Sequence, residues 1–164
     1  MKMSLKVIKS ITIRQAITNC VYVSSKNFES ETYVKIDNFV FKVESDFHIL
    51  ENEIALNNQH RTMLNLNIGD IITPEIYRSN VVISLLKLQI YDIVTGSEIK
   101  EGINFKQIQK YCYENFDGHF FTEDQIFLIV HMNGYLRCKV IYIKEEIGKL
   151  TKDTFIEFNK NCEQ

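Results

Sequence analysis

The chain has 164 residues, of which 45% are hydrophobic and 24% are charged. This balance is typical of a globular protein and excludes a largely disordered chain. The net charge of -2 argues against a general nucleic-acid-binding protein. The basic residues are unevenly placed, because several of them precede the first acid, Glu29: Lys2, Lys6, Lys9, Arg14 and Lys26. Such a leading segment either faces an acidic protein partner or forms an ordinary solvated surface.

No apolar run approaches the ~18 residues that a membrane-spanning helix needs. The first residues contain lysine but no continuous apolar region, so no secretory signal is expected. The cysteines are widely spaced, which in a chain without secretory features favours reduced thiols over disulfides: they are Cys20, Cys112, Cys138 and Cys162. We therefore expect a cytosolic protein.

The first half of the chain predicts short strands separated by turns. The segments rich in β-branched or alternating apolar residues are Lys6–Ile13, Thr18–Val23, Thr32–Ile36, Phe39–Val43, Ile54–Leu56 and Ile71–Thr73. Asp37-Asn38 has the form of a two-residue hairpin turn, and Arg61–Leu66 is expected to form one helical turn. Many short strands at close spacing predict a small barrel or sandwich.

The second half predicts a mixture of strands and one helix. Val81–Val94 is a long β-prone stretch, and Asn104 is a plausible N-cap for a helix. Apolar residues at helical spacing follow this cap, with Gly118 expected at the C-terminal end: Phe105, Ile108, Cys112 and Phe116.

The last segments predict a hairpin and a weak helix. Strands at Gln125–His131 and Tyr135–Lys144 are joined through Met132-Asn133-Gly134, which is a strong hairpin signal. Thr151–Gln164 is amphipathic and is expected to be helical. These patterns together predict a mixed β and α+β fold in two lobes, residues 1–80 and 81–164, which divide near Ile76–Val82.

A search for catalytic chemistry finds no complete motif. Phosphate-binding loops, paired metal ligands of the HxxxH or CxxC type and the GxSxG nucleophile elbow are all absent. A pair formed by Cys112 and His119 stays open, although the helical position of Cys112 favours a buried, inert thiol. Gly96-Ser97 lies in a polar loop after the expected barrel, so self-cleavage at this bond is disfavoured. The remaining candidates are basic residues at or beside predicted turns of the first lobe: Lys9, Arg14, His60, Arg61 and Arg78.

The order of residues in four stretches resembles one family. Ile17-Thr18-Asn19-Cys20-Val21-Tyr22-Val23 precedes Lys26-Asn27-Phe28, and Ile54-Ala55-Leu56 continues through Gln59-His60-Arg61 to Leu66-Asn67-Ile68-Gly69-Asp70 without a gap. Phe120–Leu128 and Tyr135–Glu145 continue the likeness in the second lobe. These stretches are similar to the N-terminal domain of the vesicle-fusing AAA ATPase, the N-ethylmaleimide-sensitive factor, over roughly Ile8 to Ile147.

The resemblance implies a double-psi β-barrel in the first lobe and a small α/β lobe after it. It also implies that the chain docks on a SNAP adaptor bound to a SNARE complex, as part of a homo-hexameric ATPase that disassembles SNARE complexes in vesicle fusion. ATP and Mg would belong to motor domains outside this chain. We therefore expect no catalytic, cofactor-binding or metal-binding residue here, no nucleic-acid partner, and a cytoplasmic location peripheral to vesicle and Golgi membranes through SNAREs alone.

The resemblance carries two basic adaptor-binding positions over to this chain, Lys9 and Arg61, and Arg61 lies in the ungapped stretch. Thr62 stands where the family tends to carry a second base, and the paired lysines of the second lobe are missing near Ile93–Thr95. Arg14, Arg78 or Lys87 is expected to replace the missing bases, and His60, beside Arg61, is a further candidate contact.

Two other functions stay open. A segregase-type AAA ATPase carries a similar two-lobed N-domain and uses it for cofactors of the ubiquitin pathway. A stand-alone double-psi-barrel enzyme is the other alternative, and turnover or a break at Gly96-Ser97 would reveal it.

Overall fold

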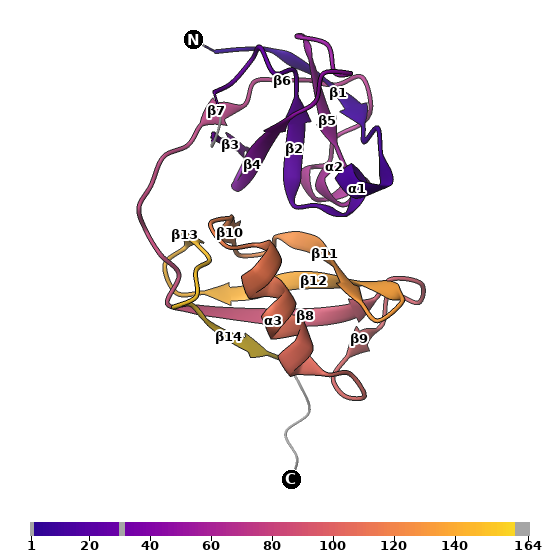
Figure 1. Cartoon of the computed structure of the whole chain (residues 1–164), viewed down its shortest axis with the longest axis vertical. Coiled ribbons are helices and arrows are strands. Elements are labelled where there is room, and N and C mark those ends of the chain that lie inside the picture. Colours follow the sequence, from indigo (N-terminus) through magenta and orange to yellow (C-terminus); the bar gives the residue numbers. More distant parts are fainter. Residues whose placement is uncertain (1, 30–31, 160–164) are drawn as a thin grey trace. The chain divides into compact units, whose positions relative to one another are not determined.

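The computed structural model describes residues 2–29 and 32–159, so the predicted thiol of Cys162 lies outside the described residues. The chain divides into two compact units, Met1–Ser79 and Asn80–Gln164, whose helices and strands are labelled in Figure 1. The fold is mixed α/β with strands predominating. It combines a strongly curled mixed sheet in the first unit with a second, mainly antiparallel sheet in the other.

The curled sheet has the strand order β6-β1-β5-β2-β4-β3-β7. Its strands are β1 (Leu5–Lys9), β2 (Cys20–Val23), β3 (Tyr33–Ile36), β4 (Phe39–Ser45), β5 (Glu53–Leu56), β6 (Ile71–Ile72) and β7 (Glu75–Ile76). The predicted strand segments of the first half are confirmed in outline. The Asp37-Asn38 turn is also confirmed, since Ile36 pairs with Phe39 and Asp37 has a positive φ of 55°.

The connections of this sheet interlock. β5 pairs with β1 in parallel and with β2 antiparallel, so it lies between two strands that are consecutive in the chain. β2 in turn pairs in parallel with β4, so it lies between β4 and β5, which are also consecutive. Alternate side chains of these strands form one apolar core, in which Leu5, Val7 and Phe41 are fully buried.

Two short helices stand at the ends of these strands. The predicted strand through Ile13 is wrong, because β1 ends at Lys9 and α1 (Ile13–Ile17) follows. Thr12 caps α1 by accepting a hydrogen bond from the Gln15 backbone N–H, which offsets the β preference of the neighbouring isoleucines. The helical turn expected at Arg61–Leu66 starts earlier, as α2 (Asn58–Leu64).

The second unit is built on a sheet of order β11-β12-β8-β14, and β9 also pairs with β8. Its elements are β8 (Leu85–Asp92), β9 (Glu98–Ile99), α3 (Phe105–Asn115), β10 (Phe120–Thr122), β11 (Ile126–His131), β12 (Gly134–Ile143), β13 (Ile147–Lys149) and β14 (Phe155–Phe158). β10 and β13 form a separate two-stranded sheet. The short strands β9, β10 and β13 were not expected from the sequence.

Local signals of the second unit are largely confirmed. Asn104 caps α3 by accepting from the Gln107 N–H, and the hairpin between β11 and β12 closes at the pair His131 and Gly134. The C-cap of α3 is Phe116 rather than the predicted Gly118, which lies two residues further on with a φ of 77°.

The helix predicted over Thr151–Gln164 is wrong for the residues that are described. Phe155–Phe158 is β14, which pairs in parallel with β8. The alternation of a strand explains the burial pattern, because Ile156 is buried while Phe155 is exposed. Within residues 2–29 and 32–159, none of the helices has the length and apolar character required to cross a membrane.

Candidate functional site

Lys9 and Arg61 are brought together around the end of strand β5. Lys9 is the last residue of β1, and its register partner in the parallel ladder is Leu56, the last residue of β5. Arg61 lies in α2, and its Nη1 donates a hydrogen bond to the carbonyl oxygen of the same Leu56. Two residues separated by 52 positions in the sequence therefore adjoin Leu56, Lys9 through its backbone register and Arg61 through its guanidinium group.

Arg14 lies on α1, which is joined to the start of α2 by a side-chain hydrogen bond. Asn57, the N-cap of α2, donates from Nδ2 to the Thr18 carbonyl at the end of α1 over 2.9 Å. Thr18 also contacts the Tyr22 hydroxyl at 2.9 Å, and Tyr22 is opposite Ala55 of β5 in the sheet. Burial raises the pKa of Tyr22, the hydrogen bond with Thr18 is the main cause that opposes this rise, and the positive charge of Arg14 acts in the same direction as that bond.

The cationic surface is defined here as Lys9, Arg14 and Arg61. Lys9 and Arg14 are exposed, and Arg61 is partly buried. Other lysines lie within 4.0 Å of a carboxylate: Lys2, Lys26, Lys42, Lys87, Lys100, Lys110 and Lys139. No ion pair of this kind within the described ranges involves a member of the cationic surface. Its charges are therefore available to an external anion.

His60 is a core residue and does not belong to this surface, contrary to the sequence-based expectation. Its side chain is fully buried, and its ring lies 4.6 Å from the ring of Phe41 between centroids. Desolvation, with a further contribution from the Arg61 charge, lowers the pKa of His60 to about 3. The imidazole is therefore neutral at physiological pH and cannot act as a basic contact.

The burial of His60 follows from the helical period. His60 and Leu64, four residues apart, are the buried residues of α2, whereas Arg61 is one position further round the helix. The His60 backbone N–H bonds to the Asn57 side-chain oxygen at 2.9 Å, and Nε2 lies 3.3 Å from Oδ1 of Asn19. This buried polar network fixes the helix that carries Arg61.

Arg78 and Lys87 do not join the cationic surface through any contact that we observe in the described residues. Arg78 is exposed and follows β7 in the last residues of the first unit. Lys87 belongs to β8 of the second unit, where its Nζ lies 3.3 Å from Glu157 and 5.6 Å from the centre of the Tyr142 ring. Its charge is already balanced by these local partners.

The second unit presents no activated nucleophile at Cys112. This thiol is fully buried on the apolar face of α3, as the helical spacing predicts. Burial raises the pKa of Cys112 to about 12, so that the thiol stays protonated at neutral pH. In the part of the chain that the structure describes, no three or more His, Cys, Asp and Glu side chains are grouped so that they could hold a metal ion.

Sequence reasoning missed the polar residues that support the cationic surface. Asn57 and Asn19 fix the two helices, and the signal available for Asn57 was its position as an N-cap residue before α2. The buried Gln15, which binds Asp46 from α1, had no comparable signal because its partner lies 31 positions away.

Comparison with known proteins adds no relative: no protein-family model matches the chain, and no curated protein sequence matches it. Any function of the cationic surface must therefore be proposed from its own residues and from the resemblance described above.

Proposed function

We propose that the chain is an adaptor-binding domain that docks on an acidic protein surface through Lys9, Arg14 and Arg61. The observation that carries this proposal is that Lys9 and Arg61 both adjoin Leu56 at the end of β5, while no carboxylate of the described residues forms an ion pair with Lys9, Arg14 or Arg61. A set of cations without internal carboxylate partners gains most from a partner of opposite charge, and such a surface directs association more than it adds raw affinity.

The resemblance to the N-terminal domain of the vesicle-fusing ATPase supports a SNAP adaptor on a SNARE complex as that partner. The two first-lobe stretches that carry the resemblance are neighbours in space. β2 pairs with β5, and Asn57 of the second stretch bonds to Thr18 of the first. The likeness therefore covers one contiguous part of the unit, the part that holds Arg61.

The topology supports the finer description of the first unit as a double-psi β-barrel. In a psi arrangement, two antiparallel strands that are consecutive in the sequence lie on either side of a third strand in the sheet. This third strand comes from elsewhere in the sequence and pairs with both. β1 and β2 enclose β5, and β4 and β5 enclose β2, so that two such arrangements interlock. We propose the barrel name for the curled sheet on this basis.

The proposal is tested by reversing the two exposed cations together. Lys9→Glu combined with Arg14→Glu should weaken binding to a SNAP–SNARE complex, and the difference from the unmutated chain should shrink as salt is raised. Lys152→Glu is the matched control, since Lys152 is an exposed lysine of the second unit. Arg61 is left intact in this test because its bond to Leu56 also supports the fold.

Two results would contradict the proposal. One is equal binding of the double variant and the control across the salt series. The other is binding of the unmutated chain to segregase cofactors of the ubiquitin pathway with no binding to the SNAP–SNARE complex, which would establish the alternative partner. A single chain should bind weakly, because avidity in the hexameric parent multiplies the affinity of one contact.

A further inference from the structure

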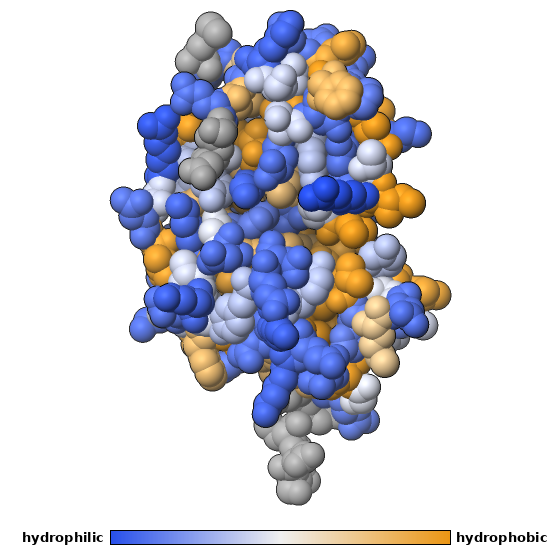
Figure 2. Space-filling view, in the orientation of Figure 1, coloured by the Kyte–Doolittle hydropathy of each residue, from blue (hydrophilic) through white to orange (hydrophobic). Residues whose placement is uncertain are grey.

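Two segments of the first unit expose large apolar side chains. Ile11 and Ile13 flank the start of α1 with exposed fractions of 45% and 77%, while Phe47 and Leu50 follow β4 with 85% and 62%. Figure 2 shows hydrophobic side chains reaching the surface on the side of this unit where Figure 1 places α1. Clustered exposed apolar residues, unlike single ones, commonly mark an interaction site.

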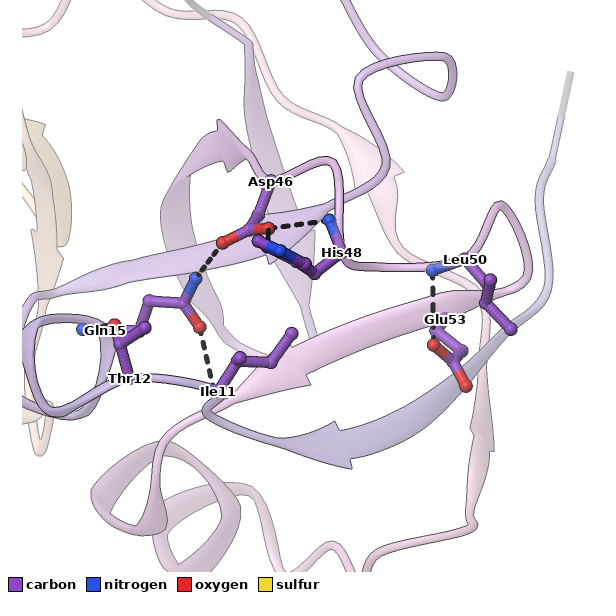
Figure 3. A network of polar contacts seen from close by, with 7 residues as sticks. All are labelled: Ile11, Thr12, Gln15, Asp46, His48, Leu50 and Glu53. Carbon is purple, nitrogen blue, oxygen red and sulfur yellow. Dashed lines mark hydrogen bonds and ion pairs between the residues drawn. The ribbon is translucent and has the colours of Figure 1, made fainter.

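The two segments are tied to each other by Gln15 and Asp46. Gln15 is buried, and its Nε2 donates to Oδ2 of Asp46 over 2.6 Å, while its Oε1 accepts from the Ile11 backbone N–H over 2.9 Å (Figure 3). Asp46 immediately precedes Phe47. One side chain therefore links the start of α1 to the loop that exposes Phe47.

The exposed phenylalanine is held in place rather than left free. The Phe47 ring lies 4.1 Å from the ring of His48 between centroids, with an interplanar angle of 34°. His48 is bound in turn to Oδ1 of Asp46, by its backbone N–H at 2.8 Å and by its Nδ1 at 3.1 Å (Figure 3). An aromatic side chain fixed before binding loses little conformational entropy when a partner covers it.

The charges beside this apolar surface are of both signs, but the acids next to Leu50 have partners within the unit. Glu51 pairs with Lys26 at 2.9 Å, and Glu53 accepts a hydrogen bond from the Leu50 backbone N–H at 3.2 Å. Arg14 directly follows Ile13 and belongs to the cationic surface, and Lys9 lies two positions before Ile11. Asp46 is the acid closest to Phe47 in the chain, and its two oxygens already accept hydrogen bonds from Gln15 and His48. The bond from the His48 backbone is the main cause that lowers the pKa of Asp46. Lys9 and Arg14 form no ion pair with a carboxylate of the described residues, and such cations at one border of an apolar surface are complementary to a segment that carries both acidic and apolar side chains.

We propose that Ile11, Ile13, Phe47 and Leu50 form an apolar docking surface for an acidic amphipathic segment of the same partner, whose carboxylates face Arg14 and Lys9. This inference rests on the proposed adaptor-binding function and adds the apolar part of its contact. Phe47 is the central anchor, since it is the most exposed of the four and is held by His48. The charges guide the encounter, and the apolar contact slows dissociation.

The test compares Phe47→Ala with Phe155→Ala, which removes an exposed phenylalanine of the second unit. The probe is the SNAP–SNARE complex, and binding is measured over a salt series. Phe47→Ala should weaken binding about tenfold through faster dissociation, which is the scale of an interface anchor. The dependence of affinity on salt concentration should be the same for Phe47→Ala as for the unmutated chain. Phe155→Ala should bind with unchanged affinity. Circular dichroism should show an unchanged fold in both variants.

The other outcomes separate this inference from the proposed function. Normal binding by Phe47→Ala, together with weakened binding by the Lys9→Glu and Arg14→Glu variant, would overturn the apolar surface and leave the cationic one standing. Weakened binding by Phe47→Ala with no effect of the charge reversal would overturn the acidic partner segment. Absence of binding by the unmutated chain would overturn both.

Discussion

Buried His60 makes the stability of the first unit depend on pH. Its ordinary pKa of 6.5 falls to about 3 in the folded chain, because the imidazolium would lose its hydration among apolar neighbours such as Phe41. Between these two values the unfolded chain binds a proton that the folded chain does not. The stability associated with neutral His60 is therefore complete above about pH 6.5 and is lost progressively as the pH falls towards 3.

The size of the effect follows from the two pKa values. A solution at about pH 5 is roughly 1.5 pH units below the pKa of His60 in the unfolded chain, so the imidazole is protonated there. In the folded chain the His60 imidazole is still almost unprotonated at this pH. At about 1.36 kcal/mol per unit, the free energy of unfolding should fall by about 2 kcal/mol relative to neutral pH through His60 alone. The variant His60→Gln lacks this titration and should lose correspondingly less stability over the same range.

Two measurements check this reasoning. NMR of the imidazole resonances should show that the His60 ring of the folded chain does not titrate between about pH 8 and 5. Urea unfolding of the first unit should then show the difference in pH dependence between the unmutated chain and His60→Gln. Leu64→Val, on the same buried face of α2, is the control for destabilisation without titration, and it should keep the pH dependence of the unmutated chain. A His60 titration near its ordinary value, or equal pH dependence in His60→Gln, would refute the proposed burial.

Two further predictions concern the second unit. Gly148→Ala should destabilise it by about 1–3 kcal/mol in thermal unfolding, because an added Cβ would lie 2.9 Å from Cγ1 and 3.2 Å from the backbone nitrogen of Ile83; unchanged stability would refute this tight packing. Burial is the main cause that raises the pKa values of Cys112 and Cys138. Both thiols should therefore resist alkylation by iodoacetamide at about pH 8 in the folded chain and react in urea. Peptide mass spectrometry measures the extent of labelling. Rapid labelling of either thiol in the folded chain would contradict its burial.

Elements with strong local signals could be predicted from the sequence. Asp37-Asn38 and Met132-Asn133 lie between strands that pair with their immediate neighbours, so the turn residues alone specify the hairpin. The helix α3 likewise carries its own cap, Asn104, and its own apolar stripe. In these cases the partners are close in the sequence, and local pattern and final structure agree.

Elements that depend on distant partners could not be predicted in the same way. The spacing of Phe155 and Phe158 resembles a helical repeat. This segment nevertheless forms a strand, because it pairs in parallel with β8, which lies some seventy positions earlier in the sequence. The β-branched residues Ile11 and Ile13 suggested a longer strand, but the cap at Thr12 starts a helix there. Tertiary pairing and capping overrode intrinsic preference at both places.

The candidate site was predictable only in part for the same reason. The sequence suggested Lys9 and Arg61 as candidates, but that both adjoin Leu56 depends on a parallel pairing between distant strands. His60 was assigned to the surface because it lies beside a predicted turn, whereas in the structure it shares the buried face of α2 with Leu64. Phe47 attracted no attention, since exposure of a single aromatic residue leaves no pattern in the sequence.

The most direct test of the central claim is to map which residues of the chain meet the SNAP–SNARE complex. Amide NMR signals of the chain, recorded during addition of the complex, should broaden or shift first around Lys9, Arg14 and Arg61, and the effect should weaken as salt is raised. Perturbations confined to the second unit, or perturbations insensitive to salt, would contradict an adaptor-binding role for the cationic surface.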